Sequence, residues 1–177
     1  MPRARTVATT AVLAAIQVAL TVTGRGTIPT PIGLNVTILS TPSIVAGVLA
    51  GPIPGAVVGA AFGVLSLALA TTPLFHDPII AVLPRLLIGP VAAGVYRLLR
   101  STNESLALLA AGAAGAATNT ALVIGLGTVL TGPVGAPYLA PAAAWDIIRR
   151  SLPPEAAIAA VIVLIVGHGA RRLTGRR

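Results

Sequence analysis

The stretch from Leu106 to Leu130 decides the fold class, because it reads LALLAAGAAGAATNTALVIGLGTVL and contains no charged residue. A helix needs about 20 mostly apolar residues to cross the hydrocarbon core of a bilayer, and this run is long enough to do so. Further apolar runs precede and follow it along the chain. We therefore predict a spanning helix here and a multi-pass membrane protein overall.

The composition supports the same class of protein. Of the 177 residues, 55% are hydrophobic and only 9% are charged, with a mean hydropathy of +0.94. A soluble domain carries about a quarter charged residues, since its surface must face water. Lipid must therefore be the outer solvent of this chain. We predict an all-α integral membrane protein whose residues 1–177 form a single domain, a bundle of six transmembrane helices in the cell membrane.

Six spans are expected from apolar runs bounded by charged or turn-forming residues: Thr6–Thr23, Val36–Ala50, Ala56–Ala70, Ile79–Leu99, Leu106–Leu130 and Glu155–Val166. The first run also has the basic start of a signal peptide, but the comparable spans that follow favour a continuous bundle. The amphipathic segment Ala142–Arg150 is interpreted as a helix in the membrane interface. The last span is predicted to begin after Pro153-Pro154, with Glu155 as an acid in its first turn.

The arginines set the expected orientation. All 12 basic residues are arginines, and the formal net charge of +8 would suggest a nucleic acid partner in a soluble protein. In a membrane protein, basic residues instead collect at the cytoplasmic ends of the spans. Eight of them fall on the side of the two termini: Arg3, Arg5, Arg97, Arg100, Arg171, Arg172, Arg176 and Arg177. We predict that both termini are cytoplasmic and that no nucleic acid is bound.

The other charged groups, Glu104 apart, map to the opposite, outer half of the bundle: Arg25, Asp77, Arg85, Asp146, Arg149, Arg150 and Glu155, joined by His76. A charge at membrane depth is a functional candidate, because its burial costs several kcal/mol unless it is paired or hydrated. Polar chemistry at one mouth of the bundle favours a ligand cavity that opens outward. A symmetric channel would need polar lining through its full depth.

The strongest candidate for ligand binding is Arg85, whose guanidinium could hold a carboxylate with two parallel hydrogen bonds. It could instead extend to the outer headgroups or pair with Asp77. Asn119 and Thr120 interrupt the fifth span, where they serve either a ligand or a hydrogen bond between helices. These alternatives are open at the level of the sequence.

Three further residues complete the candidate ligand site: Asn35, His76 and Glu155. For Glu155 the alternative is a structural role at a helix start, and for His76 it is a hydrogen bond within its loop. The chain has no cysteine and no catalytic motif with paired acids, a nucleophile elbow or a phosphate loop. We expect no metal, no cofactor and no enzymatic activity of its own.

Small residues recur at helical spacing on two of the expected helices. Gly55, Gly59 and Gly63 share one face, which favours close packing inside the bundle. Ala11, Ala15 and Ala19 share a face of the first helix, and they serve either the same purpose or contact with a partner.

Several segments, in this order and spacing, resemble the substrate-specific S components of energy-coupling factor (ECF) vitamin transporters: Thr41 to Gly47, Gly51-Pro52 to Gly59, Leu83-Pro84-Arg85 to Gly89, Asn119-Thr120 to Val123, and Pro154-Glu155 to Ile158. The similarity covers most of the chain. The arginine and Asn-Thr segments look most like the pantothenate-type branch, and the branches for cobalamin, folate and other vitamins share parts of them.

The resemblance implies a subunit that binds a vitamin from outside. It docks on a membrane scaffold (T) subunit, which couples to two ATPases, and it is thought to topple in the membrane. Ala11 and Ala15 match a scaffold-contact stripe of the family, and Arg85 and Asn119 match pocket positions. A membrane enzyme or a small channel is the weaker alternative.

The expected ligand follows from charge. Arg25, Arg149 and Arg150 are expected near Arg85, which gives the outer cavity four arginines against Asp77, Asp146 and Glu155. This excess favours a small vitamin with a carboxylate. Pantothenate fits that charge and the scarcity of aromatic residues.

Overall fold

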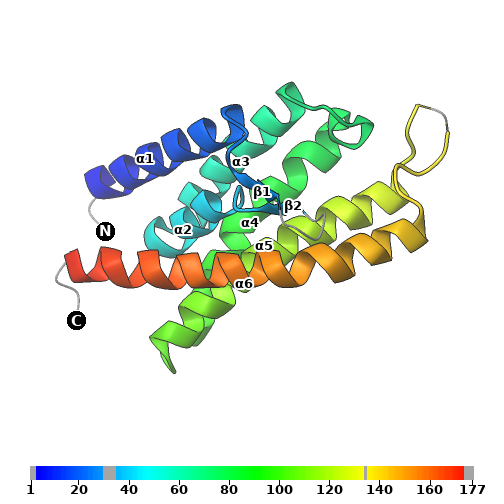
Figure 1. Cartoon of the computed structure of the whole chain (residues 1–177). Helices are drawn as coiled ribbons and strands as arrows, with labels where there is room; N and C mark the ends of the chain where they lie inside the picture. Colours follow the sequence, from blue (N-terminus) through cyan, green and yellow to red (C-terminus); the bar gives the residue numbers. More distant parts are fainter. Residues whose placement is uncertain (1–2, 30–34, 134, 174–177) are drawn as a thin grey trace.

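The computed structural model describes residues 3–29, 35–133 and 135–173. Within them the chain forms six α-helices, which are α1 (Arg3–Val22), α2 (Thr41–Ala50), α3 (Pro52–Ala68), α4 (Pro78–Leu99), α5 (Glu104–Val129) and α6 (Pro141–Leu173). The antiparallel strands β1 (Thr27–Pro29) and β2 (Asn35–Thr37) lie between α1 and α2, and a 3-10 helix, η1 (Pro73–His76), precedes α4. The fold is therefore almost entirely helical (Figure 1).

Four of the helices are long and apolar enough to cross a membrane: α1, α4, α5 and the Pro141–Ala170 part of α6. The helices α2 and α3 are apolar but shorter, with 10 and 17 residues. The chain is thus a multi-pass membrane protein, as its composition predicts. The start of α1 and the end of α6 lie toward the same end of the bundle (Figure 1).

Several predicted helix boundaries are wrong. The third helix begins at Pro52 rather than at Ala56, and the last helix continues past Val166 to Leu173. The second helix does not begin at Val36, because Asn35–Thr37 pairs with Thr27–Pro29 as a short strand and α2 starts only at Thr41. The last helix does not begin at Glu155, because α6 runs without interruption from Pro141 through Pro153 and Pro154. The segment expected as a separate interfacial helix is the first part of α6. Proline is tolerated inside membrane helices, where neighbouring groups can satisfy the carbonyls it frees.

Glycines bring three helices together at the centre of the bundle. A Cβ on Gly89 of α4 would overlap the backbone of Gly55 in α3, and one on Gly47 of α2 would overlap the carbonyl of Gly89. Between α2 and α3, Gly51 has a φ of 114°, a conformation that other residues rarely adopt. The prediction that the α3 glycines pack inside the bundle is confirmed.

The apolar core lies among α2 to α6. Its fully buried side chains include Ile44, Ile88 and Leu108 from α2, α4 and α5. The helix α1 stands at the edge of this core, since Gln17 is the buried residue among those described in it. Most of the α1 surface is therefore left for lipid or for another protein.

Candidate ligand-binding site

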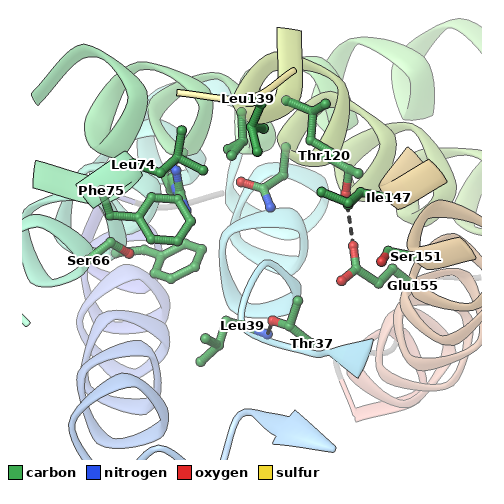
Figure 2. A pocket seen from close by; sticks show the side chains of 15 residues that line it. Thr37, Leu39, Ser66, Leu74, Phe75, Thr120, Leu139, Ile147, Ser151 and Glu155 are labelled. Carbon is green, nitrogen blue, oxygen red and sulfur yellow. Dashed lines mark hydrogen bonds between the residues drawn. The ribbon is translucent and has the colours of Figure 1, made fainter. Parts of the chain in front are cut away.

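A cavity of about 400 Å³ lies between the β2 end of the α1–α2 connection, the η1 loop and helices α3 to α6 (Figure 2). Its lining is largely apolar, with a few polar side chains. The lining residues are Thr37, Leu39, Phe62, Ser66, Leu74, Phe75, Arg85, Asn119, Thr120, Val123, Ile124, Leu139, Ile147, Ser151 and Glu155. Volume and lining are typical of a small-molecule site, which combines apolar walls with a few placed polar groups.

Close packing of α3 on α4 places the ring of Phe62 against Arg85 at the cavity wall. A Cβ on Gly59 would overlap the carbonyl oxygen of Arg85, so only glycine allows the two backbones to come this near. Phe62 follows Gly59 by nearly one helical turn, and its ring centroid lies 5.4 Å from Cζ of Arg85. The glycine thereby sets a cation–π contact at the cavity.

The η1 loop supplies the second ring. The centroid of Phe75 lies 4.6 Å from Cζ of Arg85. The loop passes directly into α4, where Asp77 caps the helix by accepting hydrogen bonds from the backbone N–H groups of Ile79 and Ile80 at 2.8 and 3.4 Å. Both phenylalanines of the chain therefore contact the same guanidinium.

Arg85 is held inside the protein, with a relative exposure of 4%. Its Nη1 donates a hydrogen bond to the carbonyl oxygen of Ile80 at 2.7 Å. This carbonyl would normally accept from the N–H of residue 84, but Pro84 has none. Both alternatives considered for Arg85 are wrong here, because its side chain neither extends to the surface nor pairs with Asp77, which caps α4.

Glu155 joins α6 to α5 on the other side of the cavity. It is 8% exposed and accepts a hydrogen bond from the hydroxyl of Thr120 at 2.8 Å (Figure 2). The expectation that Glu155 complements the dipole of a helix start is wrong, because the residue lies inside α6. Its carboxyl group instead faces the cavity beside Ser151 (Figure 2).

Two buried polar atoms on cavity-lining residues have no hydrogen-bond partner among the residues that the structure describes. They are Nε of Arg85, a donor, and Oδ1 of Asn119, an acceptor. Leaving such a group unsatisfied costs about 1–3 kcal/mol. A polar ligand in the cavity, with small side-chain shifts, would supply both missing partners.

The expected excess of positive charge at the cavity is wrong. Arg149 and Arg150 form ion pairs with Asp146 at 2.9 Å on the exposed surface of α6, and neither lines the cavity. Arg25 is exposed and does not line it either. The charged side chains of the lining are one arginine, Arg85, and one acid, Glu155. Within the described part of the chain, these two groups form no ion pair.

Of the residues predicted for ligand binding, the structure gathers Arg85, Asn119, Thr120 and Glu155 at the cavity. His76 is exposed outside the lining, and its Nε2 lies 3.2 Å from the carbonyl oxygen of Ala70, the loop contact considered for it. The backbone of Asn35 pairs with Pro29, while its side chain lies outside the described atoms. Across the described ranges, no three His, Cys, Asp or Glu residues gather where they could hold a metal ion.

The stripe of Ala11, Ala15 and Ala19 is exposed along α1. In this chain it is therefore not used for packing against another helix of the bundle. Gln17, the buried residue of α1, lies on a different face of the same helix.

Sequence reasoning missed the two phenylalanines and Ser66 and Ser151 of the lining. Phe62 lies in α3 and Phe75 in η1, and single apolar residues in a membrane protein carry no local signal that separates a pocket from packing. Their rarity is the one available hint, since the chain has 2 phenylalanines in all.

The chain matches a known protein family over most of its length. The family described as "ECF transporter, substrate-specific component" matches residues 5–167, which is nearly the whole chain and includes every residue of the cavity. A comparison with curated proteins found no match.

Proposed function

The chain belongs to the family of ECF transporter substrate-specific components, and from this premise we propose that its cavity binds a small vitamin taken up from outside the cell. Membership makes it the substrate-binding subunit of a transporter. Pantothenate is the ligand that we propose first. The family's other vitamins, such as cobalamin and folate, are the competing ligands.

One observation carries the proposal, namely the meeting of Arg85, Asn119, Thr120 and Glu155 at a single cavity of about 400 Å³. The four residues come from α4, α5 and α6, and two of them carry buried polar atoms that lack partners in the described structure. Folding has brought polar groups into an apolar bundle without satisfying all of them. This is expected where the missing partner is a ligand.

The polar groups of the cavity support a ligand that has a carboxylate at one end and hydrogen-bond donors at the other. The guanidinium of Arg85 suits a carboxylate, while the acceptors of Asn119 and Glu155 suit hydroxyl or amide N–H donors. Pantothenate has a carboxylate, an amide and two hydroxyl groups on a short chain. Its branched methyl groups suit the apolar walls made by residues such as Leu39, Val123 and Ile124.

The exposed alanine stripe of α1 supports a docking surface for the T subunit. Side chains as small as alanine let two helix backbones approach closely in a membrane. The T subunit would then couple this chain to two ATPases that perform the ATP hydrolysis, and toppling of the docked subunit would release the ligand inward.

We further propose that all six helices cross or enter the membrane, with both termini cytoplasmic. The α2–α3 pair, joined at Gly51, would form a tight hairpin whose short first helix spans only part of the bilayer. The strand β2 and the η1 loop, which both contribute lining residues, would then lie at the outer mouth of the cavity in the cell membrane.

A vitamin screen tests this function. The purified protein in detergent would be heated with pantothenate, thiamine, riboflavin, biotin, folate and cobalamin, and its unfolding temperature compared with the ligand-free value. A ligand at a hundred times its Kd stabilises the folded state by about 2.7 kcal/mol, which gives a clear shift. We expect pantothenate to give the largest shift. No shift with any vitamin would contradict a vitamin-binding subunit.

A further inference from the structure

Pro84 precedes Arg85 in α4 and is fully buried. In a helix, the N–H of each residue donates to the carbonyl four positions earlier, so the missing N–H of Pro84 frees the carbonyl of Ile80. The structure fills this vacancy with Nη1 of Arg85 at 2.7 Å. Any other residue at position 84 would offer a backbone N–H for the same oxygen.

This hydrogen bond uses one of the five N–H donors of the Arg85 guanidinium. A guanidinium can bind a carboxylate through its two terminal nitrogens or, side-on, through Nε and Nη2. Nη1 has two N–H groups and gives one of them to Ile80, so this end of the guanidinium is held in place and part of its donor capacity is used. Nε is buried with no partner in the described part of the chain. The rings of Phe62 and Phe75 cover the group without using its N–H donors.

We propose that Pro84 is a positioning residue for ligand recognition. By freeing the Ile80 carbonyl it fixes the rotation of the Arg85 guanidinium and presents the Nε–Nη2 edge for side-on binding of a carboxylate. The claim about the ligand rests on the proposed function, whereas the claim that Pro84 fixes Arg85 does not.

The test begins without any ligand. Protein labelled with ¹⁵N-arginine is placed in detergent micelles, and the Arg85 side-chain signals are assigned by their loss in Arg85→Lys. A guanidinium fixed by Ile80 gives separate, slowly exchanging Nη1 and Nη2 signals and a protected Nε proton. We expect this pattern in the unchanged protein, averaging in Pro84→Ala, and retention in Pro90→Ala. Pro90 is the matched control, because it is also inside α4 but lies outside the cavity lining.

The second measurement asks whether the fixed guanidinium serves the ligand. Pantothenate and pantothenol, which has a hydroxyl group in place of the carboxylate, are titrated into each variant. Pro84→Ala should weaken pantothenate binding by roughly threefold to tenfold and leave pantothenol binding nearly unchanged. In an Arg85→Lys background the same change should have no further effect, because Pro84 acts through Arg85.

The outcomes separate the two claims. Averaged Arg85 signals in the unchanged protein, or separate signals that persist in Pro84→Ala, would overturn the proposal. Loss of the fixed state without any change in pantothenate binding would overturn the positioning role. If the unchanged protein bound no carboxylate vitamin, the proposed ligand would be wrong. The spectra would still decide whether Pro84 fixes Arg85.

Discussion

Nη1 of Arg85 donates a hydrogen bond to the carbonyl oxygen of Ile80, which lies five residues earlier in α4, at a distance of 2.7 Å. A proline inside a membrane helix leaves a carbonyl without its hydrogen-bond donor, and an arginine there leaves a cation without a partner. Here Pro84 and Arg85 are adjacent in sequence, and a hydrogen bond from Arg85 satisfies the carbonyl that Pro84 frees. The rest of the guanidinium is satisfied by aromatic faces and, in our proposal, by the ligand.

We predict that Thr120→Val destabilises the protein, because it removes the hydroxyl that donates to Glu155 at 2.8 Å and leaves the carboxyl group buried with fewer partners. The expected loss is about 1–2 kcal/mol in the free energy of unfolding, measured by equilibrium unfolding in SDS–detergent micelles. Thr128→Val on the same helix is the control, since the Thr128 hydroxyl donates only to the carbonyl of Gly125 in its own helix. Equal effects of the two changes would contradict a specific role for the buried pair.

We predict that Gly59→Ala damages both the bundle and the site. Its added methyl group would overlap the carbonyl oxygen of Arg85 and push α3 away from α4. We expect a loss of about 2 kcal/mol or more in stability, together with weaker ligand binding. In contrast, Gly94→Ala meets open space and should be neutral or stabilise by up to about 1 kcal/mol. Unfolding and titration of both variants check this, and an unaffected Gly59→Ala would show that the close approach is dispensable.

We predict that Ala11→Leu combined with Ala15→Trp blocks uptake but leaves vitamin binding intact, because both alanines lie on the exposed face of α1, away from the cavity lining. Uptake is followed with labelled vitamin in cells that also produce the T and ATPase subunits, and binding is followed with the purified chain. The control is Ile16→Trp, at an exposed position turned about 100° around the helix from Ala15. Normal uptake by the double variant would argue against docking through this stripe.

We predict that single cysteines report a cytoplasmic location for the α4–α5 connection and an outer location for the η1 loop. The natural chain has no cysteine, so each introduced thiol is the sole target of a membrane-impermeant maleimide. Thr102→Cys should react only after the membrane is opened, while His76→Cys should react in intact cells. Labelling of residue 102 from outside would reverse the orientation drawn from the arginines.

Much of the fold follows from hydropathy alone. The bounds expected for the fourth and fifth helices, Ile79–Leu99 and Leu106–Leu130, agree with α4 and α5 to within two residues at each end. The error at Glu155 arose from a local rule, since proline followed by an acid usually marks a helix start. Neighbouring groups in a membrane protein can satisfy the carbonyls that proline frees, and α6 continues through Pro153 and Pro154.

The ligand-binding site was predicted only in part, because local sequence patterns do not show which side chains contact each other. Arg85, Asn119, Thr120 and Glu155 are conspicuous because polar groups are rare in these helices, and the structure does gather them at one cavity. The error about Arg149 and Arg150 came from counting charges without knowing their partners, since both arginines are paired with Asp146 on the surface. The contacts of Arg85 with Phe62 and Phe75 depend on how α3, η1 and α4 pack, which no local pattern encodes.

Calorimetric titration with pantothenate shows whether Arg85 lies in the ligand-binding site. We predict that Arg85→Lys binds more weakly than the unchanged protein, because lysine keeps the charge but loses the planar fork. Arg85→Ala should bind roughly tenfold to a hundredfold more weakly, the effect of one lost charge-assisted contact. Arg149→Ala, outside the cavity, should bind normally. Unchanged affinity in Arg85→Ala would remove this arginine from the site and contradict the account.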